Sequence, residues 1–102
     1  MSIAYVITFT VRDGQRERFL SMLTGVLDAM REEDSFISAI LHEDPDTPRR
    51  FLLHEVWRDH QDVLEVQLAR PYRAAWHTAL ADLLERPREI GMWTPVREDR
   101  RA

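Results

Sequence analysis

Hydrophobic residues recur along the chain with two different periods, one typical of strands and one typical of helices. Where hydrophobic and other residues alternate, or where both faces are apolar over a short run, the pattern predicts four strands. Between them the spacing becomes helical. The predicted strands cover 3–11, 36–43, 50–58 and 89–96, and the predicted helical segments cover 15–33, 60–68 and 71–86.

Each of the two main helical segments carries a continuous apolar stripe of the kind that packs on a sheet. The first stripe consists of Phe19, Leu23, Val26 and Met30, and the second of Tyr72, Trp76, Ala79 or Leu80, and Leu83. Pro71 suits the first position of the second main helix. Asp13 and Asp59 precede helical segments and are predicted to cap them.

Strand 50–58 is apolar on both faces and carries two ionisable residues, His54 and Glu55, in its middle. Because neighbouring side chains point to opposite faces, Glu55 shares its face with Trp57. A carboxylate inside an apolar strand needs a hydrogen-bond partner, a shifted pKa or a cavity. Two interpretations stay open, namely a Glu55 paired with an arginine beside a core Trp57, and a ligand site formed by both.

The element order is β-α-β-β-α-β, which is the ferredoxin-like arrangement of an α+β fold with an antiparallel sheet. Both helices cover one sheet face, yet strand 36–43 is apolar on both, with Phe36 and Ile40 predicted on one face and Ala39 and Leu41 on the other. A second copy of the chain would cover the open face, so we expect a homodimer. We expect one domain over residues 3–96 and a charged tail over 97–102.

Composition excludes several classes of protein. The 102 residues include 14 arginines and lysines that are scattered through a chain of net charge −4, which argues against nucleic-acid binding. There is no cysteine, and no apolar run is long enough to span a membrane. The first residues do not resemble a secretory signal, so we expect a cytoplasmic protein.

The histidines His42, His54, His60 and His77 lack the spacing of a metal site, so we expect no metal. His42 and His54 lie on paired strands, which leaves a weak possibility of metal binding. We expect His60 to be exposed. For His77 two interpretations remain, a half-buried structural side chain and a pocket-lining one that exchanges a proton with a phenol. Only three glycines are present, and no phosphate-binding loop is apparent.

Four segments resemble the antibiotic biosynthesis monooxygenase (ABM) family of dimeric α/β barrels. They are Val11–Gly14, Phe36–Ala39, Phe51–Asp59 with its Glu-x-Trp-x-Asp motif, and Leu68–Tyr72. The resemblance covers residues 3–96. It implies a homodimeric barrel, and because several members oxidise phenolic polyketides or quinols with O₂ alone, it implies an aromatic substrate and no metal, flavin or haem cofactor.

The resemblance has departures that bear on function. Gln67 stands where many relatives carry a histidine, and glutamine cannot transfer a proton at neutral pH. In the haem-degrading branch, Ile7 and Gln67 would replace an asparagine and a tryptophan, and only His77 falls near the expected histidine. Haem degradation is therefore disfavoured as a third possibility.

The leading hypothesis from the sequence is a cofactor-independent monooxygenase acting on a quinol or polyketide. His77 or Glu55 would deprotonate the phenol, Trp57, Tyr72 and Trp76 would wall the pocket, and Gln67 would be a polar anchor. The alternative is a dimer of the same fold that binds a small molecule without catalysis, with these aromatic residues serving as ordinary core.

Overall fold

The four predicted strands form one antiparallel sheet. The chain is described by a computed structural model over residues 2–101, in which the strands lie in the order β2-β3-β1-β4. The strands are β1 (Ile3–Thr10), β2 (Phe36–Glu43), β3 (Arg50–Trp57) and β4 (Glu89–Trp93). The α-helices are α1 (Arg16–Met30), α2 (His60–Glu65) and α3 (Ala74–Leu83), and the 3₁₀ turns η1 (Gln67–Ala69) and η2 (Pro71–Arg73) join the last two. The ferredoxin-like α+β fold is thereby confirmed.

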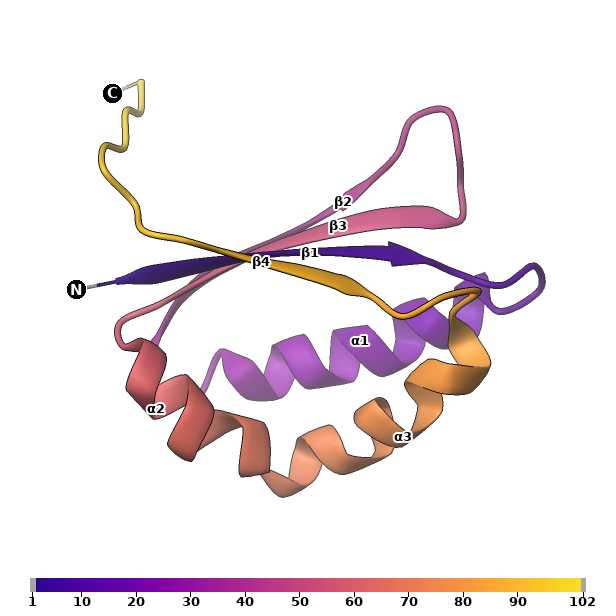
Figure 1. Cartoon of the computed structure of the whole chain (residues 1–102), viewed down its shortest axis with the longest axis horizontal. Coiled ribbons are helices and arrows are strands. Elements are labelled where there is room, and N and C mark those ends of the chain that lie inside the picture. Colours follow the sequence, from indigo (N-terminus) through magenta and orange to yellow (C-terminus); the bar gives the residue numbers. More distant parts are fainter. Residues whose placement is uncertain (1, 102) are drawn as a thin grey trace.

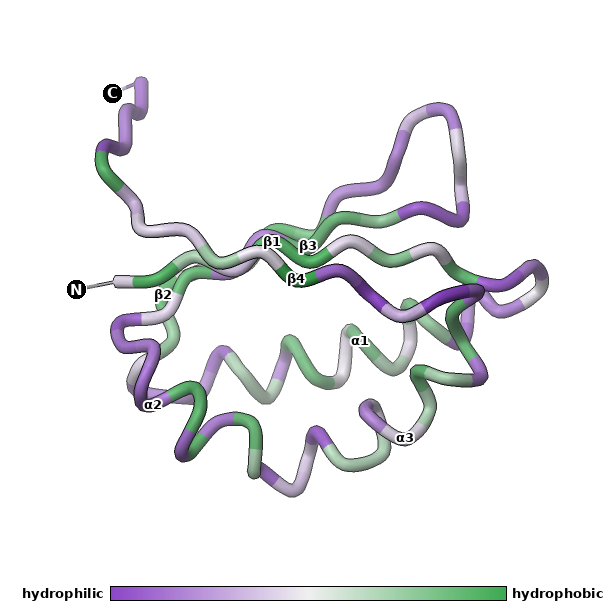
Figure 2. Tube along the Cα trace, in the orientation of Figure 1, coloured by the Kyte–Doolittle hydropathy of each residue, from purple (hydrophilic) through white to green (hydrophobic). Residues whose placement is uncertain are grey.

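All the helices cover the same face of the sheet, and the core lies between the two layers (Figure 1). Antiparallel pairing sets Tyr5 opposite Glu55 and Phe9 opposite Phe51, so these side chains share the covered face. Hydrophobic residues recur along both central strands, whereas the β2–β3 turn is hydrophilic (Figure 2). The central strands therefore supply the floor on which the helices pack.

The apolar stripe of α1 is buried as predicted, whereas the second stripe is buried only within α3, because Tyr72 lies in η2 and is half-buried. The four residues of the α1 stripe are at most 5% exposed, and α3 buries Trp76, Ala79 and Leu83. Phe19 lies at the centre of an aromatic cluster with Phe9, Phe51 and Trp76, with ring centroids 5.0–5.6 Å from it. Burying one such side chain stabilises a fold by roughly 1.5–3 kcal/mol. The cluster therefore fixes α1 and α3 on the sheet.

Several predicted details of strand and helix are wrong. A register irregularity between Phe36 and Ser38 in β2 puts Phe36 opposite Trp57, on the covered face, and not on the face of Ile40. A strand bulge of this kind reverses the alternation that the sequence suggests. Helix α1 begins after Gln15 without a side-chain cap, so Asp13 is not its cap. Asp59, by contrast, accepts a hydrogen bond from the Gln61 backbone N–H and caps α2.

The predicted ends of two elements also differ. Helix α2 stops at Glu65, because the chain tightens into η1 before Pro71. Strand β4 stops at Trp93, and residues 94–101 have no regular secondary structure. Ala102 of the expected tail lies outside the described residues. Strand β4 is an edge strand, as the proline after it suggests.

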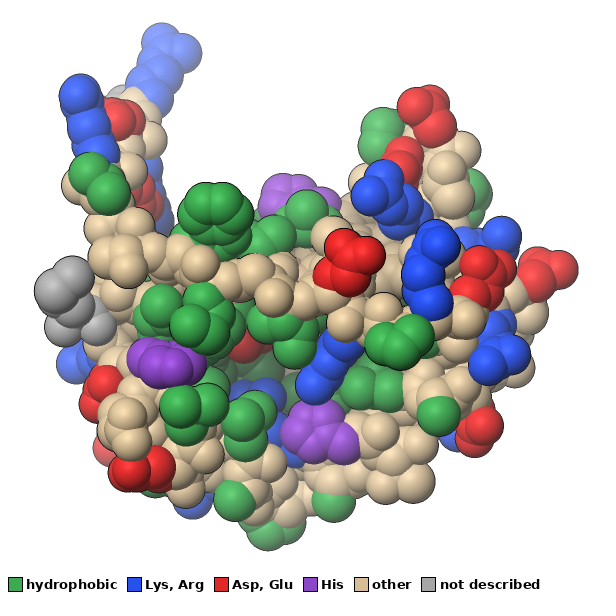
Figure 3. Space-filling model, in the orientation of Figure 1, with side chains coloured by type: hydrophobic (Ala, Val, Ile, Leu, Met, Phe, Trp, Pro, Cys, Tyr) green, Lys and Arg blue, Asp and Glu red, His purple; other side chains and the backbone are tan. Residues whose placement is uncertain are grey.

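The face of the sheet opposite the helices is uncovered, and one chain does not form a closed barrel (Figure 1). Ile40 and Trp93 lie on this face and are 53% and 64% exposed. The β2–β3 turn and the segment after β4 project on the same side, and hydrophobic side chains gather between them (Figure 3). Over residues 2–101, no helix has the length and apolar character that crossing a membrane requires.

Candidate functional site

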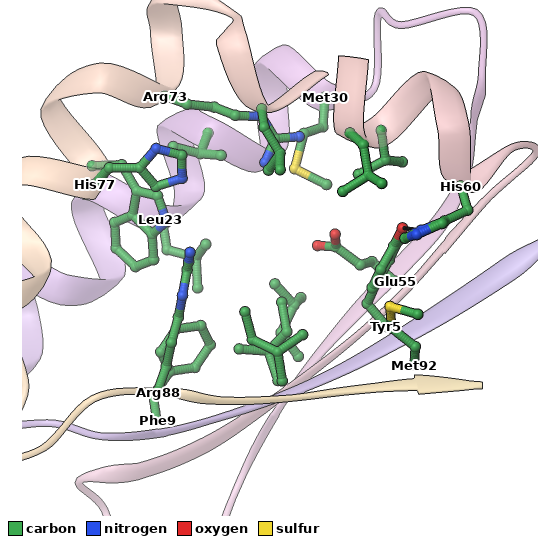
Figure 4. Close-up of a pocket in the computed structure, with 18 residues that line it drawn as sticks. Tyr5, Phe9, Leu23, Met30, Glu55, His60, Arg73, His77, Arg88 and Met92 are labelled. Carbon is green, nitrogen blue, oxygen red and sulfur yellow. Dashed lines mark hydrogen bonds between the residues drawn. The ribbon is translucent and has the colours of Figure 1, made fainter. Parts of the chain in front are cut away.

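A cavity of about 200 Å³ lies between the covered sheet face and the helices. Its walls are mostly hydrophobic side chains from β1, β3 and α1, and it appears as a hollow in Figure 3. The exposed side chains of Leu64, Leu68, Ile90 and Met92 also line it, so the rim is apolar. The polar lining residues fall into two groups, which we call the Glu55 wall (Tyr5, Glu55 and His60) and the arginine wall (Arg73, His77 and Arg88). In Figure 4 His77 and Arg88 lie opposite the Glu55 wall, and Arg73 reaches from the helical side toward the middle of the view.

Glu55 reaches the cavity from the middle of β3, where strand alternation turns it toward the helices. Its side chain is only 6% exposed, and its Oε1 accepts a hydrogen bond of 3.1 Å from the Trp57 indole N–H. Burial raises the pKa of Glu55, while the Trp57 hydrogen bond and the charges of Arg73 and Arg88 oppose the rise. Across residues 2–101, Glu55 forms no salt bridge. It is therefore a cavity carboxyl group and not half of a buried ion pair.

Tyr5 and His60 complete the Glu55 wall through a hydrogen bond between the Tyr5 hydroxyl and His60 Nδ1. The Asp59 cap fixes the start of α2 and so holds His60 beside β1. Burial raises the pKa of Tyr5, and the nearby carboxylates Glu55 and Asp59 raise it further. The expectation that His60 is exposed is therefore wrong, because its ring is half-buried at the cavity.

Arg73 belongs to η2, and its side chain is drawn across the cavity wall in Figure 4. It is 7% exposed, and its guanidinium carbon lies 5.7 Å from the Trp57 ring centroid and 5.5 Å from that of Tyr72. Arg88, just before β4, is half-buried. Burial lowers the pKa of Arg88, and the charge of Glu55 opposes this shift. The arginine wall therefore brings one buried and one half-buried cation to an apolar space.

His77 lies one helical turn after Arg73, so the two side chains share a helix face. It is half-buried and lines the cavity. Burial lowers the pKa of His77, and the positive charges of Arg88 and Arg73 lower it further. The imidazole is consequently neutral at neutral pH and has a nitrogen free to accept a proton.

The structure brings together only half of the six site residues predicted from the sequence. Glu55, Trp76 and His77 line the cavity. Trp57 and Tyr72 lie behind the lining, where they contact the Arg73 guanidinium. Because neither ring lines the cavity, their positions do not support a direct contact with a substrate.

Gln67 is also absent from the cavity lining, although it is only 2% exposed. Its amide nitrogen donates hydrogen bonds of 3.1 Å to Glu33 and to Asp62. Asp62 also accepts from the Ser35 hydroxyl, and Glu33 from Arg70. We call these five residues the Gln67 network. It ties α2 and η1 to the end of α1, so Gln67 occupies a scaffold position and not that of a polar anchor.

Four polar lining residues were not predicted, namely Tyr5, His60, Arg73 and Arg88. Arg73 could have been predicted from the sequence, because it stands between Tyr72 and Trp76 on the apolar side of a helical segment. Arg88 follows a proline in a charged stretch and carries no such signal. Among the described residues, no group of three histidine or carboxylate side chains is arranged to hold a metal ion.

Comparisons with known proteins agree with this fold. The family model described as antibiotic biosynthesis monooxygenase matches residues 2–79. The chain is 29% identical over 94 residues to a protein of Pestalotiopsis microspora that bears the name of a candidate monooxygenase, covering 91% of this chain and 78% of that one. SnoaB of Streptomyces nogalater, described as a cofactor-independent oxygenase, superposes with a TM-score of 0.81 at 26% identity over 95% of both chains. Rv0793 of Mycobacterium tuberculosis shares the fold, with a TM-score of 0.86 at 23% identity over 96% and 98%.

Proposed function

The chain belongs to the antibiotic biosynthesis monooxygenase family, and on that premise we propose that its cavity oxidises a small aromatic phenol or quinol with O₂ and no cofactor. The observation that carries the proposal is a neutral His77 beside two arginines in an otherwise apolar cavity. The likeness to SnoaB supports the same chemistry. A cytoplasmic location remains part of the proposal.

In this mechanism the His77 imidazole accepts the phenol proton and the arginine wall stabilises the phenolate that forms. The apolar walls exclude water, which keeps the anion electron-rich toward O₂. Glu55, on the opposite wall, is the alternative proton acceptor. One oxygen atom bonds to the ring carbon para to the phenolate, and the O–O bond then breaks. That carbon loses its hydrogen and becomes a carbonyl, while the second oxygen leaves as water with the ring and phenol hydrogens.

Cavity size limits the substrate to one or two rings. An engineered apolar cavity of about 150 Å³ holds benzene, so about 200 Å³ accommodates a slightly larger aromatic body. A polyketide with more rings would have to extend through the apolar rim between α2 and β4. We therefore take 1-naphthol, whose oxidation by O₂ gives 1,4-naphthoquinone and water, as the first substrate to test.

We further propose that the active form is a homodimer whose subunits meet through the uncovered sheet faces. Support comes from the exposed Ile40 and Trp93 on that face and from the projections on either side of it. Burying such a patch removes apolar area from water. Light scattering should give twice the chain mass of 12.1 kDa, and Ile40→Lys should shift the protein toward monomer. A wild-type monomer at micromolar concentration would contradict the dimer.

The proposal is tested by incubating chelator-treated protein with 1-naphthol under ¹⁸O₂. We expect ¹⁸O-labelled 1,4-naphthoquinone to form faster than in buffer, and we expect His77→Gln to lower the rate about a hundredfold or more. His42→Gln, a change at an exposed histidine outside the cavity, is the matched control. Glu55→Gln tests the alternative proton acceptor.

The outcomes separate the two candidate functions. Labelled product that depends on His77 supports catalysis with His77 as the base, and product that depends on Glu55 alone transfers that role to Glu55. If 1-naphthol binds but no product forms above the buffer rate, the non-catalytic binding protein is the better description.

A further inference from the structure

Four hydrophobic side chains around the mouth of the cavity are partly exposed to water. Leu64, Leu68, Ile90 and Met92 are between 43% and 55% exposed, and all four also line the cavity. We call these four residues the apolar rim. Exposed hydrophobic residues that occur singly are ordinary, whereas several around one opening form a patch that marks a place of contact. The apolar rim is therefore continuous with the interior of the site.

The local structure explains why the apolar rim borders the opening from two sides. Leu64 and Leu68 are four residues apart, so they fall on a common side of the segment formed by α2 and η1. Met92 pairs with Tyr5, so Met92 and Ile90 lie on the sheet face that carries the helices. The helices leave both residues half-exposed on this edge strand. A molecule that leaves the cavity between α2 and β4 consequently meets hydrophobic side chains on both sides.

A dimer formed through the uncovered sheet faces would not cover the apolar rim. Ile40 and Trp93 lie on the uncovered face, whereas Ile90 and Met92 lie on the opposite one. Neighbouring residues of a strand point to opposite faces, which separates Met92 from Trp93. The occupant best placed to cover the apolar rim is therefore a molecule that already occupies the cavity.

The cavity also determines which end of a ligand would reach the apolar rim. Met92 lies beside Tyr5 and Glu55 in Figure 4, and His77 lies across the open space from them. A phenol whose oxygen is at His77 therefore directs its other end toward Met92. Because a cavity of about 150 Å³ already holds benzene, one or two rings fill the space of about 200 Å³, and a longer substituent must leave past the rim.

We propose that the ligand of this cavity is a phenol that carries an aliphatic chain of several carbons, and that the chain lies on the apolar rim. The inference rests on the proposed function only for the phenol head. The chain is attached at a ring position other than para to the oxygen, because the proposed oxygenation needs a hydrogen at the para carbon. A hydrocarbon chain is favoured over a polar substituent because none of the four rim side chains donates a hydrogen bond.

Binding of 3-alkylphenols with chains of one, three, five and seven carbons tests the proposal, measured by calorimetry at pH 7. We expect the affinity of the wild-type protein to rise about two- to fourfold for each methylene that reaches the apolar rim, which is the gain from burying part or all of one methylene. An affinity that does not change with chain length would overturn the proposal.

Matched variants assign the gain to the apolar rim. Ile90→Ser and Ile37→Ser make the same change at residues that are 52% and 49% exposed, but only Ile90 lines the cavity. We expect Ile90→Ser to weaken binding of the seven-carbon phenol about five- to tenfold and binding of the one-carbon phenol much less, and Ile37→Ser to change neither. Leu68→Ser repeats the test from the other side of the opening. Equal binding of the seven-carbon phenol to the wild type and to both rim variants would overturn the assignment.

Light scattering of the same variants distinguishes the ligand chain from a second copy of the protein. An unchanged molecular mass, together with the weaker binding of the long-chain phenol, supports the ligand chain. If Ile90→Ser and Leu68→Ser lower the molecular mass while the affinity of the wild type does not depend on chain length, the apolar rim is an interface between copies and the proposal is overturned.

Failure of the chain site and failure of the proposed oxygenation give different results. A rim-dependent gain with chain length but no turnover of 1-naphthol would support the chain site and reject the oxygenation. Turnover of 1-naphthol with no gain from the chain would do the opposite. If neither 1-naphthol nor any of the alkylphenols binds, both proposals fail.

Discussion

The Gln67 network and the cavity are two buried polar regions supported by the same short helical segment, and they treat their charges differently. In the Gln67 network Asp62 accepts two hydrogen bonds, and these lower its pKa, with the Ser35 hydroxyl as the largest cause. In the cavity burial raises the pKa of Glu55, and Arg73 has two unpartnered donors. Paired carboxylates are typical of a scaffold, although Gln67 Oε1 in this network is itself buried without a partner, whereas a carboxyl group with a raised pKa in a cavity is typical of a ligand site.

The same comparison explains why Gln67 misled the sequence analysis. A buried glutamine next to an apolar helix fits a ligand anchor and a structural bridge equally well. What separates the two is the identity of its partners, Glu33 and Asp62, and the first of these is 34 residues away in sequence. Three predictions test the contrast.

The largest effect on stability should come from Gln67→Ala. The change removes two hydrogen bonds to carboxylates and leaves a small void, so we expect it to cost about 2–3 kcal/mol of unfolding free energy. Urea denaturation measures this cost. Gln61→Ala, at an exposed glutamine whose side chain donates a hydrogen bond to Glu65 in the same helix, should change stability by less than about 0.5 kcal/mol. If the Gln67→Ala protein instead kept the stability of the wild type but no longer bound 1-naphthol, Gln67 would belong to the ligand site and not to the scaffold.

A smaller effect is expected from Arg73→Leu. Removing the unpartnered charge is favourable, while the stacking on Trp57 and Tyr72 is lost, and the two contributions oppose each other. We expect the unfolding free energy to stay within about 1 kcal/mol of wild type. A destabilisation as large as that of Gln67→Ala would mean that Arg73 belongs to the scaffold.

The smallest effect, and the one with a pH signature, is expected from Glu55→Gln. Because the folded pKa of Glu55 is raised, its contribution to stability is complete below the ordinary glutamate pKa and is lost as pH rises through the raised value. Gln keeps an acceptor for the Trp57 indole. The variant should therefore match wild type at low pH and become relatively more stable toward neutral pH.

Urea denaturation from pH 4 to 8 measures this difference. Trp57, Arg73 and Arg88 act on Glu55 in the wild type. The half-buried His77 changes stability with pH in the opposite sense, because its pKa is lowered. To first order the His77 contribution is common to both proteins and cancels in the difference. A loss of roughly 3–5 kcal/mol in the variant would instead indicate a buried ion pair.

Local periodicity was sufficient for the fold and for the placement of Glu55 on the covered face of the sheet. The stripe on α1, the alternation of β1 and β3 and the side shared by Glu55 and Trp57 follow from 3.6-residue and two-residue repeats. These repeats fix which side chains lie on a common face of an element. Asp59 was likewise predictable, because a helix cap depends on neighbours two or three residues away.

Tertiary structure alone decided which polar residues belong to the site. Arg73 reaches the cavity from η2, His60 from α2 and Arg88 from the segment before β4, while Gln67 is bonded to Glu33 outside it. The bulge at Phe36 likewise depends on pairing with Trp57. A hydrophobic side chain gains from any apolar contact, so a local pattern suffices to place it. A polar side chain needs a specific partner at a specific distance and angle, and only the assembled fold determines which partner it meets.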